Sequence, residues 1–161
     1  MSDESARAIA AAEDLGLAHT VTRHGPVGSL QEAATARGVE PRQIVKTMVV
    51  RLADGDHRFV LVPGDREIAW PKLRALLGVS RLSLPSADAA YDVTGYVRGT
   101  ITPLGSRTPL AVVVDVSIDG PISIGAGAHD VALMVDAREL VAALDATVAD
   151  VTATSDGTRA G

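Results

Sequence analysis

Residues 44–62 read IVKTMVVRLADGDHRFVLV, and this stretch decides the fold. The β-branched run over residues 44–52 predicts a strand, and residues 59–62 predict its partner. Asp54-Gly55 lies between the two runs and is a typical hairpin signal. One lysine, Lys46, interrupts the apolar start of the first strand.

The segments on either side of this hairpin predict further helices and strands. Ser29 and Glu32 form a capping-box pattern at the start of a helix, and Pro41 opens a short helical turn. Periodicity and turn signals predict helices over residues 5–15, 30–36, 71–77, 85–91 and 136–144. They predict additional strands over residues 18–23, 110–116, 121–124, 131–135 and 147–151.

Together these elements indicate one α/β domain. The chain has 161 residues, which corresponds to a single domain at about 150 residues each. Hairpin turns outnumber long helical crossovers, so we expect about six or seven strands in a mixed or largely antiparallel sheet. The domain is expected to span residues 1–151, and the small, polar residues 152–161 are expected to form a disordered tail.

Composition excludes several classes of protein. Hydrophobic residues make up 47% of the chain but aromatic residues only 2%, which excludes a tryptophan-anchored immunoglobulin sandwich and leaves few platforms for stacking bases. The absence of cysteine excludes disulfides, thiolate metal sites and a cysteine nucleophile. It also fits a reducing cytoplasm. Neither a secretory signal nor a membrane span is evident, so we expect a cytoplasmic protein without a membrane partner.

Charge and motifs narrow the choice further. The net charge of −5 excludes a protein that coats duplex DNA, although one local patch can still contact nucleic acid. The chain has neither a Walker loop nor an HExxH motif, and its four histidines lack metal-ligand spacing. We interpret His19, His24 and His57 as surface residues and expect no metal site.

Lys46 is one of only two lysines, beside 13 arginines. In one interpretation its stem packs on the open face of a half-buried sheet and its ammonium group lies in water. In the other it projects into a cleft and holds a phosphate or a carbonyl oxygen. The residues alone leave both interpretations open.

The segment Gly99-Thr100-Ile101-Thr102-Pro103 also has two interpretations. It can be a simple bend that leads to the strand over residues 110–116. Alternatively, Gly99 lets the backbone approach a ligand closely while Pro103 keeps the loop rigid. Free main-chain N–H groups of such a loop can form an oxyanion hole.

Several motifs, taken together, resemble the YbaK family, also called the prolyl-tRNA-synthetase-associated domain. They are IVKTMVV at residues 44–50, TGYVRGTITPLG at residues 94–105, Val114-Asp115, and Gly125-Ala126-Gly127. Their order and spacing match the family from residue 8 to residue 151. The Lys46-Thr47 pair followed by the G-x-x-x-P loop is the most specific part of the match.

The resemblance implies a fold and an activity. The fold is a mixed, largely antiparallel sheet that curls into an open barrel flanked by helices. Members are free-standing enzymes that hydrolyse mischarged aminoacyl-tRNA, commonly tRNA(Pro) carrying cysteine or alanine, without a metal or organic cofactor. The implied partners are the 3′ end of aminoacyl-tRNA and, in addition, prolyl-tRNA synthetase. Whether the protein is a monomer or a dimer stays open.

The resemblance also implies which residues form the site. Lys46 stands at the family's functional lysine and Gly99 in the loop that frames the aminoacyl ester, so we expect both to be catalytic. The expected substrate-binding residues are Thr47, Thr100, Ile101, Thr102, Pro103, Gly125, Gly127 and His129. His129 and Asp130 stand where members often have a basic residue followed by glycine.

Two functions follow from this site. The first is deacylation of mischarged tRNA. The second is a non-catalytic module that binds a nucleotide or an aminoacyl end, or assists a synthetase, through the same cleft at Lys46. The co-occurrence of the lysine and the loop favours the enzyme, and a panel of mischarged tRNAs separates the two functions.

Overall fold

The computed structural model describes residues 3–154. Its helices are α1 (Asp3–Asp14), α2 (Leu30–Arg37), α3 (Trp70–Leu77), α4 (Ala87–Thr94) and α5 (Ala137–Leu144), with a short 3-10 turn η1 (Pro41–Gln43). Its strands are β1 (Thr20–Arg23), β2 (Ile44–Ala53), β3 (Asp56–Pro63), β4 (Arg66–Ile68), β5 (Val112–Asp115), β6 (Pro121–Gly125), β7 (Val131–Asp136), β8 (Thr147–Ala149) and β9 (Thr152–Thr154). Each of the five predicted helices is present, with its ends shifted by a few residues.

Seven strands form one mixed sheet in the order β1-β7-β6-β2-β3-β5-β8. These are the seven strands predicted from the sequence. The hairpin of β2 and β3 is its longest ladder, and the β1–β7 and β6–β7 pairs are also antiparallel. The β2–β6, β3–β5 and β5–β8 pairs are parallel and shorter. Because β1 and β8 do not pair with each other, the sheet is curved but not closed, as the open-barrel prediction requires.

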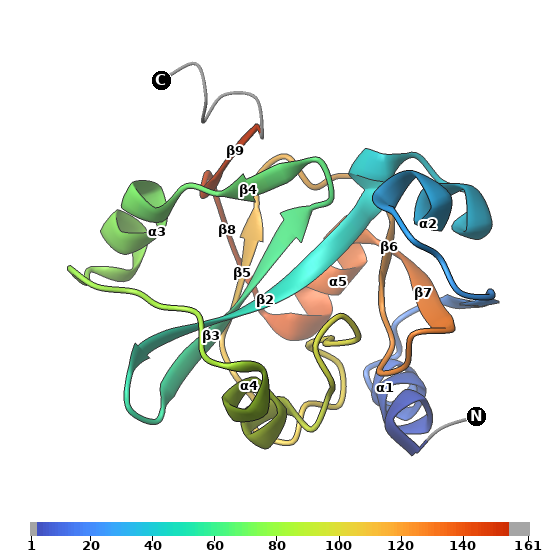
Figure 1. Cartoon of the computed structure of the whole chain (residues 1–161), viewed down its shortest axis with the longest axis horizontal. Coiled ribbons are helices and arrows are strands. Elements are labelled where there is room, and N and C mark those ends of the chain that lie inside the picture. Colours follow the sequence, from blue (N-terminus) through green and yellow to red (C-terminus); the bar gives the residue numbers. More distant parts are fainter. Residues whose placement is uncertain (1–2, 155–161) are drawn as a thin grey trace.

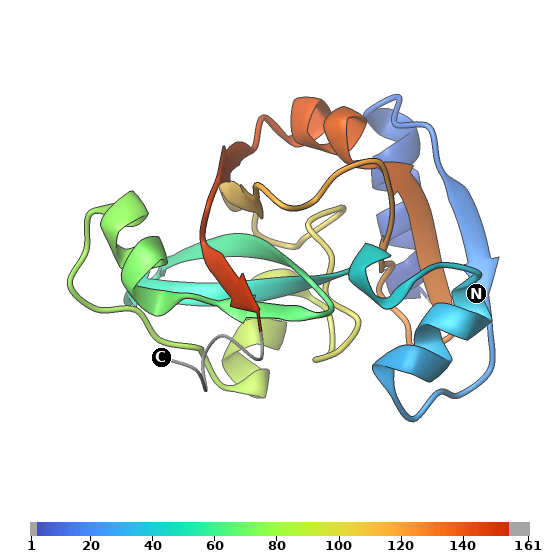
Figure 2. The same cartoon turned by 90° about the horizontal axis from the view of Figure 1, so that it is seen from above.

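The sheet turns sharply between β6 and β2. Figures 1 and 2 show β6 and β7 running across the direction of β2 and β3. The main core lies on one face of this curved sheet and combines aliphatic side chains of β2, β3, β5, β6 and β7 with Ala8 and Ala12 of α1 and Leu140 of α5. Few aromatic residues are available, and Phe59 and Tyr96 are the two that are fully buried here.

The opposite face of β2, β3 and β5 carries a smaller core that is covered by α3. Val50, Val60 and Val62 pack there with Leu73 of α3 and with Val151 near the end of the described chain. Alternate residues of β2 therefore contact two different cores, as expected for a strand buried on both faces. None of the helices within residues 3–154 is long and apolar enough to cross a lipid bilayer.

The prediction of a disordered tail over residues 152–161 is wrong for its first three residues. Thr152–Thr154 forms β9, which pairs with β4 in a second, two-stranded sheet. Arg66 donates to the Thr152 hydroxyl (2.6 Å), and the Val151 amide donates to the buried Asp115 carboxylate (3.0 Å). These partners lie 86 and 36 residues away in sequence, so the local pattern of small polar residues did not reveal the strand. Residues 155–161 lie outside the described part of the chain.

Helix α2 begins with the predicted cap, but its capping box is incomplete. The Ser29 hydroxyl accepts a hydrogen bond from the Glu32 amide (3.0 Å), as expected. The Glu32 carboxylate accepts from Gly28 (2.6 Å) instead of Ser29, because the Gly28 amide, one residue earlier, faces it. The helix ends at Gly38 in the left-handed region, which leaves Arg37 in the last turn.

Candidate active site

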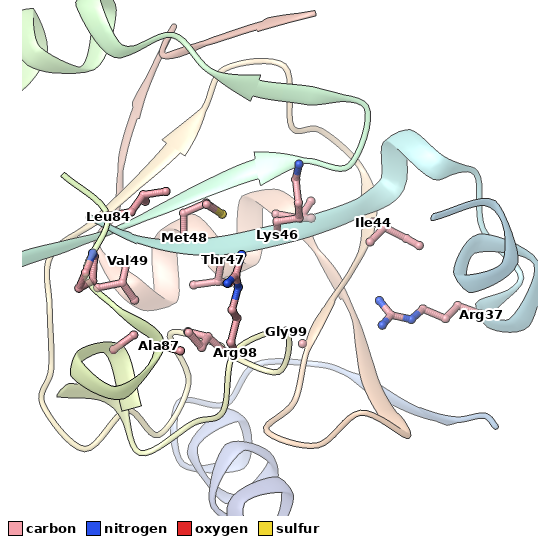
Figure 3. Close-up of a pocket in the computed structure, with 15 residues that line it drawn as sticks. Arg37, Ile44, Lys46, Thr47, Met48, Val49, Leu84, Ala87, Arg98 and Gly99 are labelled. Carbon is pink, nitrogen blue, oxygen red and sulfur yellow. The ribbon is translucent and has the colours of Figure 1, made fainter. Parts of the chain in front are cut away.

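A pocket opens where β2 and β6 diverge (Figure 3). The two strands pair only at Ile44 and Val45 of β2, and the next partner on this edge of β2 is Ser83, which bridges to Arg51. The intervening part of β2 forms one wall of a cavity of about 430 Å³. The other walls come from residues 84–90, the loop after α4, and the end of β6.

The open edge of β2 presents main-chain groups to this pocket. Arg51 donates to the Ser83 carbonyl (2.8 Å) and accepts from the Ser83 amide (3.1 Å). Since alternate residues of an antiparallel strand direct their main-chain groups to opposite edges, Thr47 and Val49 direct theirs to the same edge as Arg51. Within residues 3–154, β2 pairs with β6 only before these two residues. The pocket wall therefore offers main-chain donors and acceptors for a ligand.

The Thr47 side chain adds a hydroxyl group without a partner. Thr47 lines the pocket, and its Oγ1 is buried without a hydrogen bond to any described residue. A buried polar group left unpaired costs about 1–3 kcal/mol, so such groups are rare in folded proteins. A bound ligand that hydrogen-bonds to Oγ1 would remove this cost.

Three cations line the pocket, and no acidic residue among residues 3–154 does. Arg37 comes from the end of α2, Lys46 from β2, and Arg98 from the loop after α4, where its side chain extends toward β2 (Figure 3). Arg37 donates to the Ser123 hydroxyl (3.2 Å), and burial lowers the pKa of its guanidinium below the ordinary value. Same-sign charges in a concave site attract an opposite charge, so the pocket suits an anionic ligand.

Lys46 has a main-chain partner that the sequence did not reveal. Its side chain is exposed, and Nζ donates to the Arg66 carbonyl of β4 (3.2 Å). Figure 3 shows the Lys46 side chain pointing away from β2 on one side of the strand, while Arg98 reaches toward β2 from the other side. Lys46 therefore occupies the rim of the pocket, where its ammonium group is accessible to a ligand.

The loop after α4 forms the opposite wall through Gly99 and Ile101. Both the amide and the hydroxyl of Thr100 donate to the Val97 carbonyl (2.9 and 2.6 Å), which closes a tight turn. Gly99 lies in this turn with φ of +89°, a conformation that other residues rarely adopt. No described residue accepts a hydrogen bond from the amides of Gly99 and Ile101.

The loop packs directly on the glycine turn at the end of β6. The Gly127 amide donates to the Thr100 carbonyl (3.0 Å). A Cβ atom added to Gly125 would lie 2.9 Å from the Ile101 carbonyl oxygen, which shows how closely the two backbones approach. Gly99 similarly faces the His129 ring, 3.3 Å from the position of its own missing Cβ.

Five of the ten predicted site residues line the pocket, and the other five do not. Lys46, Thr47, Gly99, Ile101 and Gly125 line the pocket. Thr100, Thr102, Pro103, Gly127 and His129 do not line it and instead lie behind or beside its wall. Thr102, for example, is fully buried and accepts a hydrogen bond from the Leu104 amide (3.3 Å).

The other ten lining residues were not among the predicted site residues. They are the two arginines Arg37 and Arg98 and the apolar residues Ile44, Val45, Met48, Val49, Leu84, Pro85, Ala87 and Ala90. Two arginines among 13 carry no local signal. The lining contains no aspartate, glutamate or histidine, and no three such side chains within residues 3–154 gather in a possible metal site.

The fold is a single-domain α/β fold, and its pocket, lined by three cations, lies at an open strand edge. The chain belongs to the aminoacyl-tRNA editing domain family, whose model matches residues 24–143. This match confirms the family resemblance noted in the sequence.

Proline–tRNA ligases are among the similar sequences. The ligase of Citrifermentans bemidjiense is 35% identical over 101 residues, which cover 63% of this chain and 18% of the ligase. The ligase of Desulfotalea psychrophila is 44% identical over 77 residues, which cover 48% of this chain and 13% of the ligase. The chain therefore matches only a small part of these much longer relatives.

Solved structures resemble nearly the whole chain. The crystal structure of a candidate trans-editing enzyme for prolyl-tRNA synthetase superimposes with a TM-score of 0.87 at 26% identity and covers 95% of this chain and 99% of that one. The crystal structure of a hypothetical protein gives a TM-score of 0.83 at 29% identity and covers 91% of this chain and 99% of that one. The fold of this chain is thus similar to that of solved chains of comparable length.

Proposed function

We propose that this protein hydrolyses the ester bond of mischarged aminoacyl-tRNA, with cysteinyl- or alanyl-tRNA(Pro)-like molecules as its substrates. The observation that carries this proposal is a pocket with three cations, no acidic residue and an unpartnered hydroxyl on a strand edge. The family match and the similarity to a candidate trans-editing enzyme support it. Such an enzyme works in the cytoplasm, where charged tRNA is used.

The phosphates and the amino-acid side chain of the substrate each have a chemically matching region of the pocket. The phosphates of the tRNA 3′ end approach Arg37, Lys46 and Arg98, because these cations line the pocket without a competing carboxylate. The amino-acid side chain enters the apolar part between Val45, Val49 and Ile101. Size discrimination there is modest, since one methylene changes binding by about 1–3 kcal/mol.

The reaction needs a water molecule, an oxyanion site and a leaving group. Water attacks the ester carbonyl carbon, the bond to the ribose oxygen breaks, and the ribose oxygen takes up a proton, which releases the free amino acid and tRNA. Main-chain N–H groups of the loop at Gly99 stabilise the developing oxyanion, a contribution of about 3–4 kcal/mol per donor in other enzymes. No acidic residue or histidine lines the pocket. The substrate's own groups, such as a ribose hydroxyl, therefore accept the proton of water.

The remaining predicted residues have supporting roles in this proposal. Thr47 and Gly125 contact the substrate directly, while Thr100, Thr102, Pro103 and Gly127 hold the loop in shape. His129 lies beside Gly99 at the rim, where it contacts the terminal nucleotide. Prolyl-tRNA synthetase is the proposed partner that supplies the mischarged tRNA.

A panel of charged tRNAs tests the proposal. The protein is incubated with alanyl-, cysteinyl- and prolyl-tRNA(Pro) and with alanyl-tRNA(Ala), and the remaining ester is measured over time. We expect hydrolysis of the alanyl or cysteinyl ester on tRNA(Pro) and little hydrolysis of the prolyl ester. Binding of these tRNAs without hydrolysis of any of them would favour the non-catalytic module, which the lack of a described carboxylate or histidine in the pocket also permits.

A further inference from the structure

Helix α1 holds the loop that carries Gly99, although no residue of α1 lines the pocket. Figure 3 shows this helix, in pale blue, below that loop. The helix also precedes residues 24–143, the part of the chain that matches the family model. Its contribution to the site is therefore not contained in the family assignment.

One side chain of α1, that of Arg7, contacts both ends of the loop that carries Gly99. Arg7 donates from Nε to the Gly105 carbonyl (2.7 Å) and from Nη2 to the carbonyls of Gly95 (3.2 Å) and Thr94 (3.3 Å). Its guanidinium also lies over the Tyr96 ring, 4.5 Å from the centroid. A single planar cation thus joins the two ends of the segment that contains Gly99 and Ile101.

Two of the three carbonyls that Arg7 contacts lie at the C-terminal end of α4. Thr94 is the last residue of α4 and Gly95 its C-cap, where main-chain carbonyls lack helical partners and carry the negative end of the helix dipole. Within residues 3–154, Arg7 forms no ion pair with a carboxylate. Its charge is therefore directed at the main chain of the loop.

The surrounding packing leaves the loop little freedom. Tyr96 is fully buried, and its hydroxyl donates to the Leu104 carbonyl (2.6 Å). A Cβ atom on Gly105 would lie 2.8 Å from the Arg7 carbonyl oxygen, and one on Gly127 would lie 2.7 Å from that of Glu4. Both glycine turns of the site are thus seated directly against the backbone of α1.

We infer that Arg7 is a positioning residue for the reaction, and that α1 belongs to the active apparatus through it. This inference rests on the proposed deacylase function. Arg7 does not reach the substrate. It fixes the distance between the end of α4 and Gly105, and so fixes where the main-chain N–H groups near Gly99 point.

The test compares Arg7→Met with Arg7→Lys and with a matched control, Arg107→Met. Arg107 also contacts a tyrosine ring, that of Tyr91 (5.4 Å), and one carbonyl, that of Asp92 (3.2 Å), but on the exposed side of α4. The kinetic constants kcat and KM for the mischarged tRNA are measured for each variant, and thermal unfolding gives the folded fraction.

We expect kcat per folded Arg7→Met molecule to fall by about tenfold or more, because small misplacements of reacting groups are costly. We expect KM to change by less than about threefold, since the cations that bind the tRNA are unchanged. Arg7→Lys should be intermediate, because lysine lacks the planar fork, and Arg107→Met should keep its kcat. Unchanged kcat per folded Arg7→Met molecule would overturn the inference.

A second measurement separates this inference from the proposed function. Amide hydrogen exchange over residues 95–105 should accelerate in Arg7→Met but not in Arg107→Met, whatever the substrate is. If the wild-type protein hydrolyses no tRNA and Arg7→Met still loosens this loop, the proposed function fails while the positioning contact stands. If exchange in this loop is unchanged, the positioning role of Arg7 is wrong.

Discussion

Lys46 and Thr47 are neighbours in β2 but have opposite environments. Lys46 is exposed at the rim of the pocket, whereas the Thr47 hydroxyl is buried and unpaired among the described residues. Successive side chains of a strand point to opposite faces, so the pair contributes one charge and one hydroxyl to different parts of the site. Their substitution should therefore have different consequences.

Replacing Lys46 with alanine should reduce deacylation strongly and leave the fold intact. The side chain is exposed, and its one described hydrogen bond is to the Arg66 carbonyl, so Tm should change by only about 2–4 °C. Lys72→Ala is the matched control, because Lys72 pairs with Asp150 outside the pocket and should keep full activity. A fully active Lys46→Ala protein would contradict the proposed role.

Replacing Thr47 with valine should stabilise the protein while weakening catalysis. Removing a buried, unpaired hydroxyl should raise the free energy of unfolding by about 1 kcal/mol. Loss of one hydrogen bond to the substrate should lower kcat/KM about tenfold. Thr47→Ser keeps the hydroxyl and should keep the activity. Equal activity of the wild type, Thr47→Val and Thr47→Ser would contradict a role of the Thr47 hydroxyl in catalysis. Urea unfolding and initial rates supply the two measurements.

Replacing Gly99 with alanine tests whether the loop acts through its backbone. At φ of +89° the change should cost about 1 kcal/mol of stability, and the new methyl group would lie 3.3 Å from the His129 ring. If the loop positions main-chain N–H groups, the rate should also fall on the order of 100-fold.

Gly120→Ala is the control for backbone strain, because Gly120 has φ of +68°, open space around it and a place outside the pocket. It should lose similar stability but keep its rate per folded molecule. A Gly99→Ala protein that is destabilised and equally active would refute the main-chain oxyanion site.

At the scale of elements, a buried carboxylate at the end of β5 binds the main chain of Val151, the residue before β9. Asp115, at the end of β5, accepts hydrogen bonds from the Val151 amide (3.0 Å) and from the amide and hydroxyl of Ser117. Burial would raise the pKa of Asp115, but these hydrogen bonds outweigh it and hold the pKa below its ordinary value. The ionised carboxylate therefore stabilises the folded protein.

Asp115→Asn should lower the free energy of unfolding by about 3 kcal/mol at pH 7, because the amide nitrogen cannot accept the bonds from Ser117. The pKa of Asp115 is lower in the folded than in the unfolded protein, so this stabilisation is complete above about pH 4 and is lost as pH falls through the folded pKa. The difference in free energy of unfolding between wild type and variant, measured by urea unfolding, should therefore be smaller at pH 3 than at pH 7. Asp150→Asn is the control, because this carboxylate is exposed, and it should change the free energy of unfolding only slightly at both pH values.

At the scale of the whole molecule, charge is distributed unevenly. The chain carries a net charge of −5, yet the pocket is lined by three cations and no acid. The net charge repels a polyanion, whereas the cations of the pocket attract it locally. Binding of a tRNA end should therefore be local and strongly dependent on salt.

The affinity for a short single-stranded RNA should fall with salt in proportion to the number of phosphates contacted. For three contacts, a plot of log K against log salt concentration should have a slope of about −2. Arg98→Gln should reduce the slope by about 0.7, whereas Arg138→Gln on α5, outside the pocket, should not change it. A salt-independent affinity would contradict phosphate binding by these cations. Fluorescence titration at several salt concentrations measures the slope.

Local sequence signals are sufficient to predict most of the elements and the family. Seven strands, five helices and the hairpin at residues 44–62 follow from periodicity and turn residues, because these signals act over a few neighbouring residues. The motifs at Lys46, Gly99 and Gly125 were close enough to the family pattern to identify it. The missed strands, β4 and β9, have three residues each and no such signal.

Only the tertiary structure decided which residues share the pocket. Arg37 and Arg98 lie 61 residues apart in the sequence, and both line the pocket that forms because β2 leaves β6 after two pairs, which no local pattern encodes. The unpaired Thr47 hydroxyl and the contacts of Arg7 with the loop likewise depend on long-range packing. Local propensity selects helices and strands, but the gap between two strands, and hence the site, arises from how the whole sheet curves.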